Sequence, residues 1–303
     1  MNKNVLIIGG SGFVGTQLTK AHLKELDTVS ILDNESNSLK IIDQDVLDSN
    51  FFGRYYNADV ERINSFLNIE QFDLVYHLAS ESRPLEFHVK YNSIIGANVI
   101  GLEQILKYIK PETRLVFAST SEIYGDSKED RLSENDSSVI NSKYQRNVYA
   151  LSKLLGESIL QNRKDVNWVI TRLFNSYGPQ FRDDDTKVIP TIINCIKNNT
   201  TFPLCGDGNQ IRSFTYIDDT VKGLMLAAEE GIKHETYNIG SNFYHTINEL
   251  LEIVNLKYKK IDARLGEPFI RKADIQKSIN VLGYKAEIPL KEGLKKIFKY
   301  HHF

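Results

Sequence analysis

Short runs of apolar and β-branched residues alternate with longer amphipathic stretches along the first half of the chain, and this rhythm restricts the possible folds most. Most of the runs are continuously apolar, as expected when helices cover both faces of a parallel sheet. We therefore predict an α/β fold with a doubly wound parallel sheet and crossover helices. The predicted strands are Val5–Ile8, Val29–Leu32, Tyr55–Ala58, Asp73–Leu78, Arg114–Ala118 and Trp168–Leu173.

The pattern loosens after Gly178 and Pro179. We predict a larger domain over residues 1–178 and a smaller α/β part built mainly from residues 179–303, with some exchange of chain between the two. The elements predicted beyond the boundary are helices over Val188–Lys197, Asp218–Glu230, Thr246–Asn255 and from Leu290, strands over Ser213–Ile217 and Thr236–Ile239, and a glycine-rich loop over Cys205–Gly208.

A long polar stretch, Asp126–Asn147, interrupts the strand and helix pattern of the larger domain. Loops of this length in compact domains are commonly functional. The stretch is therefore either a lid over a site or a solvated surface insertion.

The charge balance excludes several classes of protein. The 303 residues carry 37 Lys and Arg against 39 Asp and Glu, a formal net charge of −2, so no overall positive field attracts nucleic acid or anionic lipid. The longest apolar run is too short for a signal peptide or a membrane span, and we expect a cytoplasmic protein. Cys195 and Cys205 have neither metal-site nor disulfide spacing, so we expect two buried thiols and no metal site.

Glycines follow the first predicted strand at a spacing that suits a dinucleotide. Gly9, Gly12 and Gly15 stand three residues apart, and a predicted helix over Gln17–Leu26 follows them. Such a turn brings backbone close to a pyrophosphate at a helix N-terminus. Asp33 ends the second strand, eighteen residues past Gly15, where a carboxylate binds ribose hydroxyls and favours NAD over NADP. The alternative is a glycine turn in an ordinary βα unit.

Two later strand ends fall at the same predicted edge of the sheet. Asp59 and Val60 follow the third strand, and His77–Ser80 ends the fourth. Ligands of doubly wound sheets bind at the carboxyl ends of the strands. Asp59 is equally well explained as a helix cap or as an adenine contact.

Tyr149 and Lys153 stand four residues apart and so share one face of a predicted helix. A phenol has an ordinary pKa near 10 and needs a neighbouring cation to act as a base at neutral pH. Lys153, together with the positively charged nicotinamide of an oxidised cofactor, can supply that charge. Chance spacing within a helix is the alternative for the pair taken alone.

The fifth strand leads into Ser119–Gly125, which brings three hydroxyls and the Glu122 carboxyl to the end of the sheet. The hydroxyls can hold a substrate hydroxyl near Tyr149, and Glu122 is a candidate general acid or base. A capping cluster of Ser and Thr is the competing explanation.

Taken together, these segments resemble the extended short-chain dehydrogenases/reductases that act on nucleotide sugars. The matches run in order from residue 5 to about residue 295 and so cover nearly the whole chain. The matching segments are Gly9–Gly15, Asp33, His77–Ser80, Ser119–Gly125, Tyr149–Lys153, Arg172–Pro179, Arg212–Phe214, Tyr216–Asp219 and Tyr237–Gly240.

The resemblance implies an NAD-dependent enzyme with a Rossmann domain over residues 1–178. In that family Tyr149 would take the proton from a sugar hydroxyl while hydride passes from carbon 4 to NAD, and Lys153 would bind the nicotinamide ribose. Thr120 would bond the reacting hydroxyl, and Asn175 and Arg212 would hold the substrate diphosphate.

The resemblance and the residue patterns together give the complete set of candidate site residues. The catalytic candidates are Tyr149, Lys153, Thr120, Ser121 and Glu122. The candidate NAD contacts are Gly9, Gly12, Phe13, Val14, Gly15, Asp33, Asn34, Asp59, Val60, Leu78, Ala79, Ser80, Asn98, Ser119, Tyr149 and Lys153. The candidate substrate contacts are Glu81, Thr120, Asn175, Arg182, Val188 and Arg212.

The reaction that follows oxidation at carbon 4 is less constrained. Many nucleotide-sugar 4,6-dehydratases carry Asp where this chain has Ser121, whereas the string Thr120–Glu122 also resembles UDP-glucuronate decarboxylases. We therefore expect decarboxylation of a nucleotide-uronic acid. The alternatives are 4,6-dehydration, 4-epimerisation, release of the 4-keto sugar, or a non-catalytic NAD-binding sensor.

Family members commonly form homodimers through two helices of each subunit, which correspond here to residues 85–108 and 148–163. Apolar residues in the first of these stretches fall on one helix face. Sequence leaves open whether that face meets the chain's own sheet or a second subunit. The residues are Ile94, Ile95, Val99, Leu102, Ile105 and Leu106.

Overall fold

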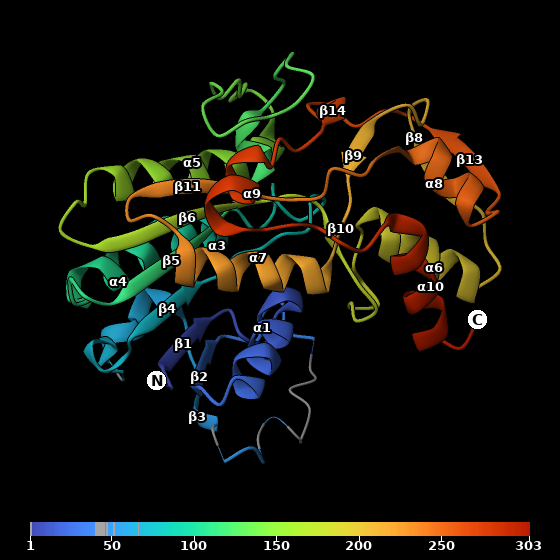
Figure 1. Cartoon of the computed structure of the whole chain (residues 1–303). Coiled ribbons are helices and arrows are strands. Elements are labelled where there is room, and N and C mark those ends of the chain that lie inside the picture. Colours follow the sequence, from blue (N-terminus) through green and yellow to red (C-terminus); the bar gives the residue numbers. More distant parts are fainter. Residues whose placement is uncertain (1, 40–45, 47, 51, 66) are drawn as a thin grey trace.

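A seven-stranded sheet forms the centre of the protein in a computed structural model that describes residues 2–39, 46, 48–50, 52–65 and 67–303 (Figure 1). Every neighbouring pair in it is parallel, in the order β11-β6-β5-β4-β1-β2-β3. The predicted doubly wound α/β fold is thus confirmed. The strands are β1 (Asn4–Ile8), β2 (Thr28–Asp33), β3 (Phe52–Asn57), β4 (Leu74–His77), β5 (Arg114–Thr120), β6 (Asn167–Leu173) and β11 (Glu235–Ile239).

Helices cover both faces of this sheet, which explains the continuously apolar strands. In β1, Val5 and Ile7 join a core cluster with Leu224 of one helix layer, whereas Leu6 and Ile8 pack with Leu102 of the other. Burial of both faces is the main source of stability for such a sheet. The helices are α1 (Phe13–Lys24) and α7 (Ile217–Glu230) on one side, with α3 (Tyr91–Ile95), a π-helical segment (Gly96–Gly101), α4 (Leu102–Tyr108) and α5 (Val148–Gln161) on the other.

The smaller part lies beyond the carboxyl ends of the central strands, on the right in Figure 1. Its three small sheets are β10-β7, β12-β9-β14 and β13-β8. Its elements are β7 (Ser176–Tyr177), α6 (Val188–Lys197), β8 (Phe202–Cys205), β9 (Ile211–Ser213), β10 (Thr215–Tyr216), β12 (Tyr244–Thr246), α8 (Ile247–Ile253), β13 (Tyr258–Ile261), β14 (Ile270–Arg271) and α10 (Leu290–Tyr300). Helix α9 (Gln276–Leu282) packs instead on α7 and on β11 of the central sheet. Of the later segments, α7 packs on the central sheet and β11 extends its edge beside β6.

The predicted strand Ser213–Ile217 is wrong as a single element. Strand β9 ends at Ser213, β10 pairs with β7 over two residues, and helix α7 already begins at Ile217. The chain leaves one small sheet for another at this point, and the Ser213 hydroxyl bonds the Ser241 carbonyl at 2.5 Å. A continuous apolar and aromatic run conceals such a change of partner.

Short 3-10 turns connect several of these elements. They are η1 (Val60–Ser65), η2 (Ile69–Gln71), η4 (Ser121–Tyr124) and η5 (Gln145–Asn147). The polar stretch after η4 is anchored to the body of the protein: Leu132 is fully buried and bridges Ala273, and Val139 bridges Gly125. The stretch is therefore tied to the body of the protein at these two points, while most of its residues are exposed.

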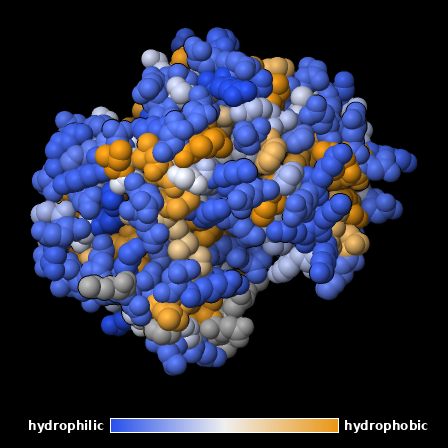
Figure 2. Space-filling view, viewed as in Figure 1, coloured by the Kyte–Doolittle hydropathy of each residue, from blue (hydrophilic) through white to orange (hydrophobic). Residues whose placement is uncertain are grey.

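The remaining expectations concern the surface. Cys195 is buried as predicted, but Cys205 at the end of β8 is only half-buried. The face shown in Figure 2 is mostly hydrophilic, with apolar residues gathered in separate patches. Among the described residues, no helix is long and apolar enough to cross a membrane, and no group of three or more His, Cys, Asp or Glu side chains could hold a metal ion.

Candidate active site

A cavity of about 340 Å³ lies where the carboxyl ends of the central strands meet the smaller part. Its lining comes from the glycine loop after β1, the ends of β4 and β5, helix α5, and the segments before α6 and around β9. Ligands of doubly wound sheets bind at this edge. The site candidates that line it are Gly9, Gly12, Phe13, Val14, Gly15, Leu78, Ser80, Glu81, Ser119, Thr120, Ser121, Glu122, Tyr149, Lys153, Asn175, Arg182, Val188 and Arg212.

The glycine loop forms a backbone cradle that side chains would fill. Gly9 has φ of +87°, and a Cβ there would stand 2.6 Å from the Ala79 amide nitrogen. A Cβ on Gly15 would stand 2.1 Å from the Gly9 carbonyl oxygen. Helix α1 begins directly after Gly12, so its first-turn N–H groups and dipole face this loop. These features fit the pyrophosphate of a dinucleotide.

Asp33 ends β2 beside the cradle. Its carboxylate accepts hydrogen bonds from the backbone N–H groups of Ser11 at 3.0 Å and Glu35 at 2.7 Å, while burial raises the pKa of this carboxyl. The two bonds orient it next to the glycine loop. The exposed Asn34 donates to Asp59 at 2.6 Å. This arrangement fits a ribose-binding position.

Six candidate NAD contacts do not line the cavity: Asp33, Asn34, Asp59, Val60, Ala79 and Asn98. The clearest departures are Val60, which packs in the hydrophobic core, and Asn98, which is fully buried and donates to the Ser152 hydroxyl at 2.9 Å. Both are engaged in packing or hydrogen bonds within the protein. Val60 opens a 3-10 turn and Asn98 lies within the π-helical segment, and neither position shows in the sequence that the side chain is buried.

Tyr149 lies on the first turn of α5 and faces the cavity. Its ring stacks on Phe87 at a centroid distance of 4.5 Å. Burial raises the pKa of the phenol above its ordinary value, whereas a hydrogen bond with Thr120 lowers it, and the charges of Glu122 and Glu81 raise it further. The phenol needs added positive charge before it can act as a base at neutral pH.

Lys153 lies one turn further along α5 and is 2 % exposed. Its ammonium donates to the Ala118 carbonyl at 2.7 Å and lies 4.7 Å from the centre of the Phe117 ring. Burial lowers the pKa of Lys153 to about 7. The side chain thus lies against β5, two residues before Thr120, and both Lys153 and Tyr149 line the cavity.

Glu122 lies between arginines that sequence reasoning missed. Arg146 approaches its carboxylate at 3.3 Å and Arg271 at 4.0 Å. Burial raises the pKa of Glu122, but the charges of Arg146, Arg271 and Arg212 outweigh burial and lower it below its ordinary value. Glu122 is therefore held as a carboxylate. In the sequence, only the position of Arg146 three residues before Tyr149 hints at a place in the site. Nothing in the sequence around Arg271 indicates that it contacts Glu122.

Arg212 reaches the cavity from β9 and is already engaged. It donates to Glu267 at 2.9 Å and to the Phe269 carbonyl at 3.1 Å. Glu267 and Arg264 both line the cavity and come from the segment after β13. A diphosphate would therefore meet Arg212 in competition with Glu267, a residue that sequence reasoning also missed.

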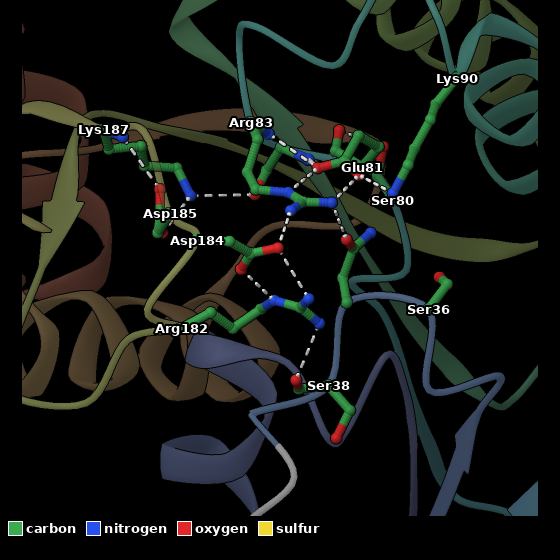
Figure 3. Close-up of polar contacts among 12 residues, drawn as sticks. Ser36, Ser38, Ser80, Glu81, Arg83, Lys90, Arg182, Asp184, Asp185 and Lys187 are labelled. Carbon is green, nitrogen blue, oxygen red and sulfur yellow. Dashed lines mark hydrogen bonds and ion pairs between the residues drawn. The ribbon is translucent and has the colours of Figure 1, made fainter. Parts of the chain in front are cut away.

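Glu81 and Arg182 belong to a charged cluster at the cavity mouth (Figure 3). Glu81 accepts hydrogen bonds from Arg83 at 2.9 Å and Lys90 at 3.2 Å, and Asp184 joins Arg83 to Arg182. Although burial alone raises the pKa of Glu81, the hydrogen bonds from Arg83 and Lys90 lower it to about 2. Glu81 is thus occupied by its own cations before any substrate arrives.

A model of the NAD dependent epimerase/dehydratase family matches residues 5–240, and the chain belongs to this family. It is therefore an enzyme with NAD as its cofactor, and the non-catalytic alternative is excluded. The glycine cradle and the charged cavity described above fit that cofactor.

Among curated proteins, two UDP-glucuronic acid decarboxylases of Arabidopsis thaliana are similar over nearly the whole chain. Decarboxylase 6 is 28% identical over 97% of this chain and 87% of its own length; decarboxylase 1 is 30% identical over 97% and 68%. The solved UDP-glucuronic acid 4-epimerase of Bacillus cereus, in complex with UDP-glucuronic acid and NAD, is 25% identical, covers 98% of each chain and has a TM-score of 0.84.

Proposed function

We propose that this enzyme oxidises carbon 4 of a nucleoside-diphosphate uronic acid and then releases the carbon 6 carboxylate as carbon dioxide. One observation carries this proposal: Glu122, which follows Ser121 in the chain, is held ionised between Arg146 and Arg271. Its charge also acts on the Tyr149 phenol, whose pKa it raises. Tyr149 supplies a base for oxidation and the arginines supply cations, whereas neither Ser121 nor the ionised Glu122 is a ready acid for expelling water.

The oxidation step falls to Tyr149 and Thr120. Thr120 orients the reacting hydroxyl, and the phenolate oxygen of Tyr149 takes its proton. Lys153 of α5, whose ammonium donates to the Ala118 carbonyl of β5, holds the positive charge that favours the phenolate. Bound NAD would supply the acceptor for a hydride from carbon 4 of the sugar, in a reversible transfer.

Loss of carbon dioxide then needs no further acid. In a 4-keto uronic acid the electron pair of the bond between carbon 5 and carbon 6 moves toward the carbon 4 oxygen as carbon dioxide leaves, and carbon 5 then takes up a proton from water. Carbon 4 would finally take back the hydride and its oxygen the proton held by Tyr149, so the product is lighter than the substrate by one carbon dioxide. The Tyr149 hydroxyl and Thr120 remain placed to stabilise the negative charge on that oxygen. Arg146, which lines the cavity beside Glu122, is a cation that can meet the leaving carboxylate.

Elimination of water is less well supported. A carbon 6 hydroxyl leaves only when a proton donor reaches it, and position 121 offers a serine. The neighbouring Glu122 is ionised, because the arginines lower its pKa. We therefore place 4,6-dehydration behind decarboxylation.

The relatives support a nucleotide-uronic acid as the substrate. UDP-glucuronic acid appears in the names of the similar decarboxylases and in the B. cereus epimerase complex. The epimerase makes inversion at carbon 4 the second candidate, because its substrate would fit the same cavity. UDP-glucuronic acid is accordingly the first substrate to test.

The deciding experiment is incubation of the purified enzyme and NAD with UDP-glucuronic acid, followed by mass spectrometry and NMR of the sugar product. We expect a product lighter by one carbon dioxide. An isomer of unchanged mass would establish epimerisation instead, and loss of water from dTDP-glucose or GDP-mannose would establish dehydration. Absence of turnover with UDP-, GDP-, CDP- and dTDP-sugars would overturn the proposal.

Tyr149→Phe tests the base directly. Removing the hydroxyl should reduce sugar oxidation by at least about a thousandfold while NAD still binds, because the ring retains its stacking on Phe87. Single-turnover absorbance of reduced nicotinamide measures the step, and NAD titration is the control. Undiminished oxidation would show that another group is the base.

We also propose that two copies of the chain pair through α3 and α5. The chain's own core buries four of the predicted residues, Ile94, Leu102, Ile105 and Leu106. Other apolar residues, on α3 and α5, are exposed and line a shallow groove. Such a patch is typical of an interface. Its exposed members are Tyr91, Ile95, Leu151 and Leu155.

Leu155→Lys should convert the dimer to a monomer, because a charge in the centre of an apolar interface must be desolvated. Analytical ultracentrifugation of both proteins measures this, with Leu265→Lys as the control, since Leu265 is 81% exposed and lies outside the groove. A monomeric wild-type protein would contradict the proposed pairing.

A further inference from the structure

Glu157 is a buried carboxylate that the proposed mechanism does not use. It lies on α5, one helical turn beyond Lys153, and is 5 % exposed. An ionised group at this depth is expensive unless it is paired and hydrogen-bonded. Its partners therefore indicate why it is there.

Two groups hold the Glu157 carboxylate from neighbouring strands. Arg172 of β6 donates to it from Nε at 3.1 Å and from Nη2 at 2.8 Å, a two-pronged arrangement. The hydroxyl of Ser119, on β5, donates to the same carboxylate. Ser119 directly precedes Thr120, so Glu157 fixes the strand end that presents the Thr120 hydroxyl.

Arg172 is itself held on its far side. It donates from Nη1 to the Tyr124 hydroxyl at 3.0 Å and to the Glu134 carbonyl at 3.0 Å, and Tyr124 donates to Asn238 at 2.6 Å. Glu157 thus stands at one end of a buried network that reaches the packed polar stretch and β11. The carboxylate has no freedom to leave its position.

Lys153 lies one helical turn before Glu157 on the same face of α5. Among the described hydrogen bonds, the Lys153 ammonium makes one, to the Ala118 carbonyl, and no ion pair. The other titratable groups around it are Tyr149 on its own helix and His77 on β4, and burial and the Lys153 charge lower the pKa of His77 to about 3. His77 is therefore neutral, and Glu157 supplies the negative charge that raises the pKa of Lys153 against burial.

From these contacts we infer that Glu157 is a positioning residue, which keeps the Lys153 ammonium charged and holds the Ser119–Thr120 strand end against Tyr149. The Glu157 carboxylate then acts on both groups beside the Tyr149 phenol. It acts on Lys153 through its charge, and on the Thr120 hydroxyl through Ser119. The inference rests on the proposed roles of Tyr149 and Lys153, but not on which sugar is the substrate.

The test is the titration of Lys153 in the NAD-bound enzyme, measured by NMR with ¹³C-labelled lysine and assigned by the signal lost in Lys153→Met. Glu157→Gln keeps an oxygen that can accept the Ser119 hydrogen bond but removes the charge. We expect the Lys153 midpoint to fall by about one pH unit or more. An unchanged midpoint in Glu157→Gln would overturn the inference.

Two further variants separate charge from simple loss of packing. Glu157→Asp restores the charge on a shorter side chain, so the Lys153 midpoint should return toward the wild-type value even if thermal stability does not. Tyr124→Phe breaks the same network beyond Arg172 without removing a charge, and should lower stability while leaving the midpoint unchanged. If Tyr124→Phe moved the midpoint as far as Glu157→Gln, the role of Glu157 would be structural only.

The same variants have a catalytic readout once a substrate is known. The alkaline limb of the pH profile of kcat should move to lower pH in Glu157→Gln, because Lys153 loses its proton earlier, with little change in KM. Failure of all nucleotide sugars to react would refute the proposed function but would leave the Lys153 titration as an independent result.

Discussion

The two halves of the cavity recognise their ligands by different means. The cofactor half consists mainly of backbone: the glycine loop after β1, the first turn of α1, and backbone N–H groups that orient the Asp33 carboxylate at the end of β2. The substrate half consists of long charged side chains, with Arg146 and Arg212 paired to Glu122 and Glu267. One half presents mainly main-chain groups, and the other presents charged side chains that are already paired.

The cofactor half therefore selects its ligand by shape, and the substrate half selects its ligand by charge. A backbone cradle tolerates no added atom, because the nearest groups are main chain and cannot move aside. A paired arginine can exchange one anion for another at modest cost, because the carboxylate it releases is partly exposed and returns to water. Single changes should therefore abolish function in the cofactor half and alter affinity in the substrate half.

The largest effect is expected for Gly15→Val. Its Cβ would collide with the Gly9 carbonyl, so the loop must open and the cradle is lost. NAD affinity measured by calorimetry should fall by about a thousandfold or more, as when a close-packed site is filled. Gly283→Ala is the control, since an added Cβ there meets nothing within 4 Å and the strain of its φ of +64° falls at the end of α9, outside the cavity. NAD binding that survives Gly15→Val would refute the cradle.

A smaller effect is expected for Arg212→Met. Loss of the guanidinium leaves the substrate diphosphate without its fork, and kcat/KM should fall about a hundredfold, chiefly through KM. NAD affinity should be unchanged, which is the contrast with Gly15. Lys128→Met is the control, because Lys128 is 84% exposed in a surface ion pair. Equal losses of NAD and sugar binding would show that the two halves do not act separately.

The smallest effect is expected for Glu81, which lines the cavity. Its pKa falls from 4.5 to about 2 on folding, so its ion pairs stabilise the fold above pH 4.5 and are lost as pH falls toward 2. Glu81→Gln should cost about 2 kcal/mol at pH 7 and flatten the pH dependence of stability in that window. Urea unfolding at several pH values measures both effects. An unchanged acid limb would show that the cluster contributes nothing to stability.

Local pattern predicted the cofactor half well, because each of its features lies within one short segment. The glycines, the strand before them and the helix after them are consecutive, and Tyr149 and Lys153 share one turn of α5. The substrate half was predicted only in part. Arg271 reaches Glu122 across 149 residues of sequence, and Glu267 reaches Arg212 across 55.

Pattern also gives no sign of which polar residues are already bound by neighbours inside the protein. Asn98 was expected at the cofactor and is buried against Ser152. Glu81 was expected at the substrate, and its carboxylate is bound by Arg83 and Lys90. Whether a polar side chain faces a ligand or a neighbour depends on what other segments bring beside it.

The sequence by itself determined the parallel sheet, the glycine turn and the Tyr149/Lys153 pair, because period, chain stiffness and helical spacing act over a few residues. Only the tertiary structure decided which charges meet. Arg146, Arg271 and Glu122 converge from three separate segments, and Glu157 is clamped by Arg172 and Ser119 from two strands. Electrostatic partners are chosen by distance in space, and distance in space is fixed only after the chain has folded.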